Sequence, residues 1–536
     1  MKIQMTITFI TATLFLLHSC AEVVPVPPVV LPEGEEHEDP SPAASTGDIQ
    51  VWTYPDVISE TQYGYLKRSE IYEVRVSNGN DSAEIYVMAD RNSFQLTDPN
   101  SGQGKKMTRH NHYGSFSFKG KVEIHIRRKD RGSLEGLKVY PLDKKYDYTI
   151  QGDSVIINLD SWAYLYVDTP DLHKEPLFIF ADPAEDSVPR KSMSEVLNPG
   201  MDAATIRNRI LNTPQKTIYF EPGVYDFGND TSRDYPGYQL PIVSNKDYYI
   251  PGGAVIIGSF YNGGNVSDTK FYGRGIITGC GKERLPNAES IPYSLFYTGS
   301  GTGNSIEGLH FFAPPHFCVL SRGELDTRYA KMCGWYHQTD GWGGGSNSTI
   351  ADSFIKVNDD FVKLYNQNQK VNNVVMYKQI NGAAIQLGWN AAGSARGCTV
   401  EDIYIVDEDN KTPSGICNTA VINLMNNGNS NISDILFKNI HMDNKVQFFL
   451  GLNGHGGSIS NLTFESIQES KGAYNAKNYI ATQQDNNSVF NNFRFVDYRI
   501  NGKKVTCAAD MNLQQYMAEG TTILKTDCNL ITPTFE

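Results

Sequence analysis

The sequence predicts an all-β protein in which an N-terminal β-sandwich is followed by a right-handed parallel β-helix. Three observations support this fold class. From about residue 48, short segments alternate apolar and polar residues between turns. The later part of the chain repeats one turn-and-strand unit at nearly constant spacing. High contents of Gly (47), Tyr (30) and Phe (25) also favour β structure with tight turns.

The N-terminus has the pattern of an export signal. Lys2 precedes an apolar run from Ile7 to Leu17, which is short for a transmembrane helix. The following His18-Ser19-Cys20 resembles a bacterial lipoprotein cleavage site. We expect a signal peptide over 1–19 and a lipid on Cys20, which would anchor the exported protein to the bacterial outer membrane, on its surface or its periplasmic face. An ordinary signal peptide with a chance cysteine is the alternative. Residues 20–47, which are acidic and rich in Pro and Ser, predict a flexible tether.

Residues 48–185 are expected to form the sandwich. Strand-like alternation is clear over 71–76, 83–87 and 122–126. The run over 177–182 is expected to be the last strand of this domain. Frequent turn residues between these runs favour antiparallel strands in two packed sheets.

Residues 186–536 are expected to form the solenoid. Met201 to Leu211 predicts a helix with Ile206, Ile210 and Leu211 on one face. A strand interrupted by Pro222-Gly223 follows, as at the start of many parallel β-helices. The chain length is also too great for one compact domain and agrees with two.

An internal repeat carries the prediction of a solenoid. Each unit has an apolar or β-branched residue, any residue, a turn residue (Gly, Asn, Asp or once Tyr), and a residue that opens a strand. Successive units start 21, 23, 21, 29, 32 and 27 residues apart. Coils with a fixed strand count and insertions in loops on one side produce such spacing, whereas a second sandwich would not. The units start at Ile306, Thr327, Ile350, Val371, Val400, Ile432 and Ile459.

Three aspartates lie close together in the middle of this repeat. Asp340 belongs to one coil, and Asp359 and Asp360 belong to the next. Equivalent positions of adjacent coils lie about 4.8 Å apart, so Asp340 should lie beside Asp360, with Asp359 one residue away. We expect the glycine-rich stretch over 341–347 to form an inserted loop. An isolated aspartate usually marks a turn or the surface, but carboxylates that flank a water are the usual means of hydrolysing a glycosidic bond.

The strands after the aspartates offer candidate sugar contacts. Lys363 and Tyr365 follow the aspartate pair and could hydrogen-bond to hydroxyl groups. The next coil would bring Gln386 and Trp389 near the carboxylates, and an exposed indole is a common platform for a sugar ring. The alternative for these side chains is a role in the core.

Over about 340–410 the chain resembles glycoside hydrolase family 49, the dextranase and isopullulanase family. The resemblance rests on 338–341, 357–360, Lys363, Tyr365 and 385–389, in the family's order and spacing. It implies a sandwich followed by a pectin-lyase-like β-helix, and inverting, endo-acting hydrolysis of α-glucan. The general acid would be Asp359, and the base Asp340, Asp360 or both. It implies no metal or organic cofactor, and dextran α-1,6 linkages, or pullulan, as the substrate.

Two other functions compete with this one. The polygalacturonase-type family 28 has a similar aspartate set, but it also uses a Gly-His-Gly and a basic motif. Here Gly454-His455-Gly456 lies about 95 residues beyond Asp360, with no Arg-x-Lys in the following coil. The other alternative is a non-catalytic glycan-binding lipoprotein, which would not need three clustered carboxylates.

Charge and cysteine content narrow the partners. A net charge of −13 disfavours nucleic acid and anionic polysaccharides and favours a neutral polysaccharide. We expect a monomer whose contact with a membrane is limited to the lipid. Cys507 and Cys528 flank the C-terminal tail and could form a disulfide, while Cys318 and Cys333 have the apolar contexts of buried thiols.

Overall fold

The computed structural model describes residues 48–61, 64–91, 95–97, 104–106, 110–172, 175–227, 239–279, 294–335, 338–389, 393–409, 418–474, 477–519 and 523–536. The expected signal peptide, Cys20 and the expected tether lie outside the described residues. Within the described ranges, no helix is long and apolar enough to cross a membrane.

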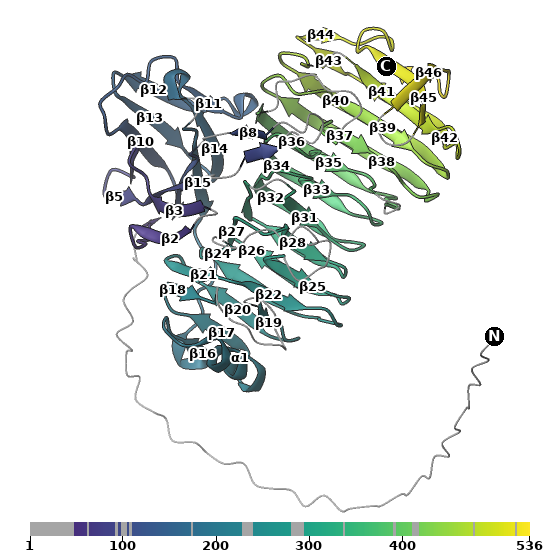
Figure 1. Ribbon diagram of the computed structural model, residues 1–536. Helices are drawn as coiled ribbons and strands as arrows, with labels where there is room; N and C mark the ends of the chain where they lie inside the picture. Colours follow the sequence, from purple (N-terminus) through teal and green to yellow (C-terminus); the bar gives the residue numbers. More distant parts are fainter. Residues whose placement is uncertain are drawn as a thin grey trace, which may run out of the picture. The chain divides into compact units, whose positions relative to one another are not determined.

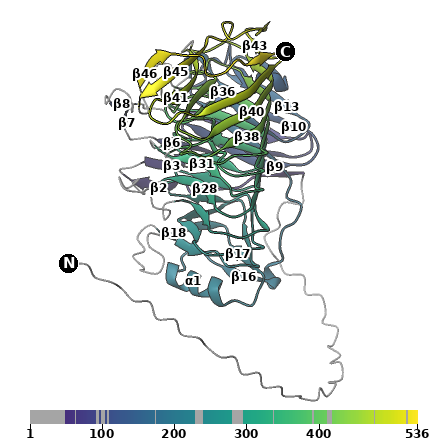
Figure 2. The ribbon, with the colours of Figure 1, turned by 90° about the vertical axis from the view of Figure 1, so that its right-hand side faces the viewer.

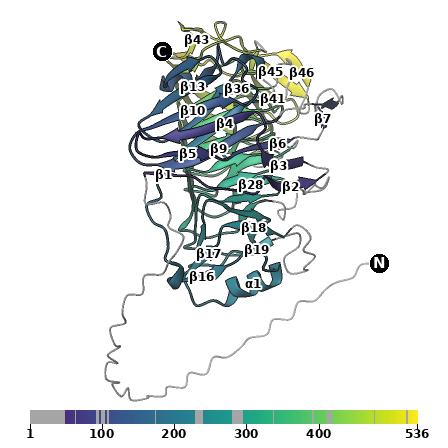
Figure 3. The same ribbon diagram turned by 90° about the vertical axis from the view of Figure 1, so that its left-hand side faces the viewer.

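The N-terminal part is a sandwich of two mainly antiparallel sheets. Apolar side chains from both sheets, such as Val74, Phe116, Ile124 and Ile179, form its core. Figure 3 shows the smaller sheet on the viewer's side. The larger sheet contains β1 (Ile49–Gln50), β2 (Val57–Thr61), β3 (Gly64–Arg68), β6 (Val87–Arg91), β9 (His112–Phe118), β11 (Lys138–Tyr140), β14 (Ala163–Asp168) and β15 (Leu177–Pro183). The smaller sheet contains β4 (Tyr72–Ser77), β5 (Ser82–Ile85), β10 (Val122–Arg128), β12 (Asp147–Gln151) and β13 (Ser154–Leu159). β7 (Gln95–Thr97) and β8 (Gly104–Lys106) pair separately.

The C-terminal part is a parallel solenoid whose coils are stacked from α1 toward the C-terminus (Figure 1). This arrangement confirms the predicted all-β fold class. The longer sheet contains β16 (Ser194–Leu197), β17 (Thr217–Phe220), β18 (Gly223–Asp226), β20 (Asp247–Ile250), β21 (Ala254–Ile257), β23 (Lys270–Gly273), β24 (Ile276–Thr278), β26 (Asn304–Glu307), β27 (His310–Phe312), β29 (Leu325–Arg328), β30 (Lys331–Cys333), β32 (Thr349–Lys356), β34 (Lys370–Lys378), β36 (Thr399–Glu408), β38 (Ile432–Met442), β40 (Ser458–Glu469), β42 (Val489–Val496), β43 (Arg499–Ile500), β44 (Lys503–Lys504) and β47 (Thr534–Phe535).

A second parallel sheet of the solenoid carries the residues of most interest for function. Figure 2 shows β28 and β31 of this sheet among the stacked coils. Its strands are β19 (Gln239–Pro241), β22 (Ser259–Asn262), β25 (Phe296–Thr298), β28 (Phe317–Ser321), β31 (Asp340–Gly343), β33 (Val362–Lys363), β35 (Ile385–Gln386), β37 (Ile422–Leu424), β39 (Leu450–Gly454), β41 (Asn478–Gln483), β45 (Leu513–Glu519) and β46 (Ile523–Asp527).

The predicted helix is α1 (Ala203–Asn212), which lies at the start of the solenoid. The carboxylate of Asp202 caps it by accepting a hydrogen bond from Thr205 N at 2.8 Å. Ile206 and Ile210 are buried in the solenoid core, as predicted. The prediction that Leu211 shares this face is wrong. Leu211 lies five residues after Ile206, which places it on another side of the helix, and it is 48% exposed.

The repeat corresponds to a turn that needs left-handed backbone geometry. The third residue of every unit has a positive φ, for example 49° at Asp352 and 52° at Asn373. Gly, Asn and Asp adopt this conformation at the lowest cost, which explains their recurrence. The predicted alignment holds from Ile306 as far as Val400. Val400 then pairs with Phe437, not with Ile432, because two left-handed turns occur in β38 and the pattern selected the earlier one.

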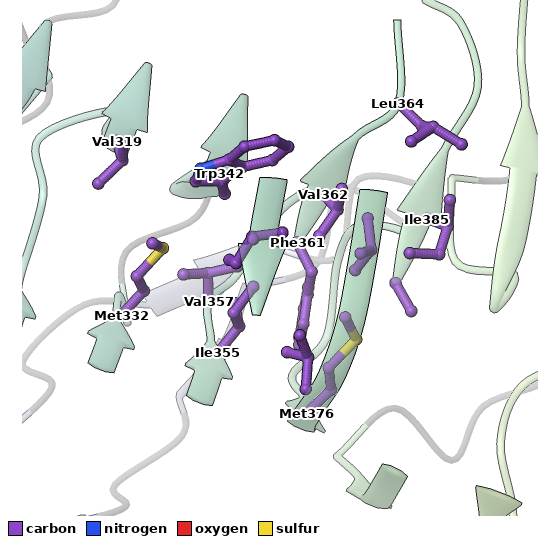
Figure 4. Close-up of a cluster of buried hydrophobic side chains, with 14 of the residues drawn as sticks. Val319, Met332, Trp342, Ile355, Val357, Phe361, Val362, Leu364, Met376 and Ile385 are labelled. Carbon is purple, nitrogen blue, oxygen red and sulfur yellow. The ribbon is translucent and has the colours of Figure 1, made fainter. Parts of the chain in front are cut away.

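Part of the solenoid interior is a stack of apolar side chains that includes Trp342, Val362 and Ile385 (Figure 4). Trp342, Val362 and Ile385 occupy one register position on successive coils, and all three are fully buried. The prediction of a loop over 341–347 is therefore wrong for its first three residues, because 341–343 belong to β31. A Cβ on Gly341 would lie 2.4 Å from the carbonyl oxygen of Phe361, so close packing explains this glycine.

A buried ion cluster joins the larger sandwich sheet to the solenoid, and both lie in the unit Ser45–Glu536. The Nζ of Lys331 lies 3.0 and 2.8 Å from the two carboxylate oxygens of Asp182, and it also donates to the Gly308 carbonyl. Arg274 and Glu185 lie beside this pair. We call these four residues the seam cluster. It fixes the sandwich against the solenoid where both partners are shielded from water.

Cysteine contacts differ in part from the prediction. Cys318 and Cys333 are buried, as expected. Cys507 carries a free, exposed thiol, so the suggested disulfide from Cys507 to Cys528 is wrong.

Candidate active site

The register of adjacent coils brings the three aspartates together. Asp340 begins β31, and Asp360 lies just before β33. The main-chain N–H of Asp360 donates to Oδ1 of Asp340 at 3.2 Å. One carboxylate oxygen from each of Asp340, Asp359 and Asp360 lies within 4.8 Å of the others. The convergence expected from the repeat is therefore observed, with Asp340 and Asp360 buried and Asp359 half-buried.

A bend in the chain at Asn358 and Asp359 allows both members of the pair to face the same region. The side-chain oxygen of Asn358 accepts from the N–H groups of Ile380 and Asn381, each at 3.2 Å. Gly382 has a φ of 88°, and a Cβ there would lie 1.9 Å from the carbonyl carbon of Asp359. The bend thus depends on a buried amide on one coil and a glycine on the next.

Lys363 supplies a positive charge to two of the carboxylates. Its Nζ lies 2.6 Å from Asp360 Oδ2 and 3.0 Å from Asp340 Oδ1. Burial alone would lower the pKa of Lys363, but the two aspartates outweigh it and hold this pKa well above its usual value. The three carboxylates would suit a cation, and the lysine ammonium provides one. Lys363 thus organises the carboxylates, in addition to any contact it makes with a hydroxyl group.

His316 is a second neighbour of Asp340. Its Nε2 lies 3.2 Å from Asp340 Oδ2, and its ring packs against Phe317. Burial tends to raise the pKa of Asp340, but Lys363 and then His316 outweigh this effect and hold the pKa below its usual range. Asp340 is therefore kept ionised by two neighbours, as a group that accepts a proton requires.

Asn418 contacts the other two carboxylates. Its Nδ2 donates to Asp360 Oδ1 at 2.8 Å and to Asp359 Oδ1 at 3.2 Å. Asp360 Oδ1 also accepts from the N–H of Ala383 at 3.2 Å. Asp360 is thus held by a cation, a side-chain amide and a main-chain N–H.

A pocket of about 460 Å³ opens beside this cluster. Its walls include His316, Phe317, Arg322, Lys363 and Tyr365. The phenol oxygen of Tyr365 is buried there without a hydrogen-bond partner among the described residues. Burial raises the pKa of Tyr365, so the hydroxyl keeps its proton. A sugar hydroxyl in the pocket could supply the missing partner, which agrees with the expected role of Tyr365.

The two expected sugar contacts on the next coil differ from each other. Trp389 is 38% exposed, so its indole is available to a ligand. Gln386 is fully buried, and both ends of its amide are bonded within the protein, to the carbonyl of Gly388 and to Asn423. The structure therefore gives Gln386 a supporting role in place of the expected contact with sugar, because its amide is bonded to Asn423, its register partner on the next coil.

The sequence prediction missed His316 and Asn418. Phe317 pairs with Asp340, so His316 lies one residue before that position on the preceding coil. Extending the alignment to the preceding coil would have identified His316. Asn418 follows a long insertion between β35 and β37, and the insertion removes the regular spacing that located the aspartates.

Comparisons with known proteins agree with this fold, although no family model matches the chain. A dextranase from Arthrobacter globiformis is 22% identical over 466 residues, covering 71% of this chain and 70% of the relative. An isopullulanase from Aspergillus niger is 23% identical over 375 residues, covering 61% and 63% respectively.

A solved structure agrees in fold. Dex49A from Penicillium minioluteum superimposes with a TM-score of 0.67 at 18% identity, covering 86% of this chain and 94% of that chain. This similarity extends across both the sandwich and the solenoid.

Proposed function

We propose that this chain belongs to glycoside hydrolase family 49 and that it is an inverting, endo-acting hydrolase of α-glucan, with the α-1,6 linkages of dextran as its substrate. The observation that carries the proposal is the meeting of Asp340, Asp359 and Asp360 beside a pocket on adjacent coils. The dextranase relatives supply the substrate.

We assign the proton donor to Asp359. Lys363 forms ion pairs with Asp340 and Asp360, so its positive charge lies beside the two candidate bases. Asp359 is half-buried and accepts from the neutral amide of Asn418. In this assignment Asp359 protonates the glycosidic oxygen as the bond to the anomeric carbon breaks. Asp340 or Asp360 accepts a proton from the water that attacks the opposite face of the sugar.

The spacing of the carboxylates bears on the stereochemistry. Inverting enzymes usually separate their two carboxyl groups by about 6.5–9.5 Å, to admit the water. Here one oxygen from each of the three carboxylates lies within 4.8 Å of the others, which is shorter than this range. The anomer of the first product distinguishes inversion from retention directly.

A second candidate substrate is pullulan, which the isopullulanase relative favours. A panel of dextran, pullulan and polygalacturonate, read by product sizing, tests both. We expect short oligosaccharides from dextran early in the reaction, as endo action requires. If only pullulan yields products, pullulan replaces dextran as the proposed substrate. If only polygalacturonate yields products, the proposal of an α-glucan substrate is overturned. His455 contacts Asp485, which lies outside the three-aspartate cluster. This contact agrees with the view that Gly454-His455-Gly456 matches the polygalacturonase motif only by chance.

We also propose that Cys20 is lipidated and that the protein is anchored to the outer membrane as a monomer. The residue pattern before Cys20 supports this proposal. Cys20→Ser should move the protein from the membrane fraction to the soluble fraction after export. An unchanged distribution would contradict the lipid anchor.

A further inference from the structure

One amide contacts two carboxylates of the site at once. The Nδ2 of Asn418 donates to both Asp360 and Asp359, at 2.8 and 3.2 Å. An amide nitrogen carries two protons, so each carboxylate receives one of them. Two neighbouring carboxylates repel each other, and a donor shared between them reduces that repulsion and fixes which oxygen each group presents.

A chain of amides fixes the orientation of Asn418. Gln386 Nε2 donates to the carbonyl of Gly388 at 2.9 Å, which leaves its oxygen toward Asn423. The Nδ2 of Asn423 then donates to Gln386 Oε1 and to Asn418 Oδ1, each at 2.9 Å. Since a carbonyl only accepts, this order directs the NH₂ group of Asn418 to the carboxylates. Gln386 and Asn423 are fully buried, so water does not compete for these bonds.

The main chain around Asn418 is also held. The Nζ of Lys378 donates to the carbonyl of Thr419 at 2.7 Å and to that of Gly382 at 3.2 Å. Lys378 pairs with Glu408 at 3.2 Å, and both side chains are buried. One ammonium thus ties the segment that follows Asn418 to the glycine that packs against Asp359.

We propose that Asn418 is a positioning residue, and that the amides of Asn423 and Gln386 act through it to hold Asp359 and Asp360 in working geometry. This inference rests on the proposed hydrolysis of α-glucan. Loss of the shared donor would let both carboxyl groups rotate, and small misplacements of catalytic groups cost about 10–100-fold in rate.

The test is the pH profile of Asn418→Ala on dextran. We expect kcat to fall about 10–100-fold, with KM little changed. We also expect the pH profile to differ from that of wild type, because the geometry of both carboxylates changes. The charged and titratable groups facing the cluster are Asp340, Asp359, Asp360, Lys363, His316 and Tyr365. Asn423→Ala should lower kcat by a smaller amount, again with KM little changed. Asn418→Asp, which keeps the shape but adds a charge, should not restore activity.

Asn427 offers a matched control. It is a buried asparagine whose bonds go to Ser430, Gly456 and His455, away from the carboxylates. Asn427→Ala should lower Tm without moving the pH profile. If Asn418→Ala behaves like this control, with activity reduced only in proportion to the folded fraction, the inference is overturned.

A second readout does not need activity. Loss of the shared donor should let the two carboxyl groups turn, and a crystal structure of Asn418→Ala would show this directly. The carboxyl oxygens of Asp359 and Asp360 should lie in positions that differ from those of wild type. Unchanged positions of both carboxyl groups would contradict the inference. A wild type that cleaves no α-glucan, with the turned carboxyl groups still seen in Asn418→Ala, would overturn the proposed function alone.

Discussion

The seam cluster and the carboxylate site both place a lysine among carboxylates, yet the pKa values of the two lysines shift in opposite directions. At the seam, burial lowers the pKa of Lys331 to about 8 despite Asp182. At the site, burial acts in the same direction, but Asp340 and Asp360 hold the pKa of Lys363 well above its usual value. Burial is common to both, so the difference comes from the neighbouring charges.

The charge balance explains the contrast. The seam cluster has two carboxylates and two cations, and Lys331 and Asp182 are fully buried. The site has three carboxylates around one lysine, beside a pocket. A closed, balanced cluster holds two parts of a fold together. An unbalanced one next to a pocket is costly for stability and suited to moving protons.

Asp359→Asn should have the largest effect on activity. The amide keeps the shape but cannot donate the proton, so hydrolysis of dextran should fall about 10³-fold or more. Reducing-sugar release measures the loss, and thermal unfolding should show a Tm close to that of wild type. Activity near the wild-type level would remove Asp359 from the mechanism.

Exchanging each lysine for methionine separates the two clusters. Without Lys363 the pKa of Asp340 should rise, because the ammonium favours its ionised form. The acid limb of the pH–rate profile should therefore move to higher pH, and kcat should drop about 100-fold. Lys331→Met should instead reduce stability by about 3–5 kcal/mol, with kcat per folded molecule unchanged.

A loss of stability in Lys363→Met together with a loss of kcat in Lys331→Met would contradict the contrast between the two clusters. Denaturant unfolding and the pH–rate profile, measured on both variants, give the two quantities. An acid limb that stays in place in Lys363→Met would show that this ammonium does not set the ionisation of Asp340.

Gly382→Ala tests the close approach to Asp359. The added Cβ would overlap the main chain of Asp359, so kcat should fall about 10–100-fold. Gly502 is the matched control, because it also has a positive φ, of 74°, but its Cβ would meet open space. Gly502→Ala should carry only the backbone cost, of about 1 kcal/mol, seen as a lower Tm. Equal loss of kcat in both variants would mean that backbone strain, not contact with Asp359, is responsible.

Trp389→Ala should have the smallest effect. Loss of an exposed stacking platform should raise KM about 2–10-fold and leave kcat unchanged. Initial rates over a range of dextran concentrations measure both. An unchanged KM would place the indole outside the path of the substrate.

The sequence determined the site to the extent that its local turns repeat. Left-handed turn residues such as Asp352 and Asn373 mark each coil, so counting between them placed Asp340 beside Asp360. The same logic selected the wrong turn at Ile432, because β38 contains two. Local pattern could not separate a glycine-rich loop from a glycine-rich strand, since close packing against Phe361 is a property of the tertiary structure.

Side chains that reach the site from outside the local pattern could not be predicted in the same way. Asn418 follows an insertion of irregular length, and no periodicity relates it to Asp360. The side-chain amide of Gln386 is of a type that could bind a sugar, but in the fold it is bonded to Asn423 on the next coil. Spacing therefore predicted the carboxylates, whereas the amides that hold them required the three-dimensional structure.

The anomer of the first product is the most direct test of the mechanism at the three aspartates. Proton NMR of fresh dextran digests, followed from the first minutes, reports this before mutarotation mixes the two forms. If water held by Asp340 or Asp360 attacks the face opposite the bond that Asp359 protonates, the β-anomer appears first from the α-linked glucan. An initial α-anomer would mean retention of configuration and would contradict the assignment.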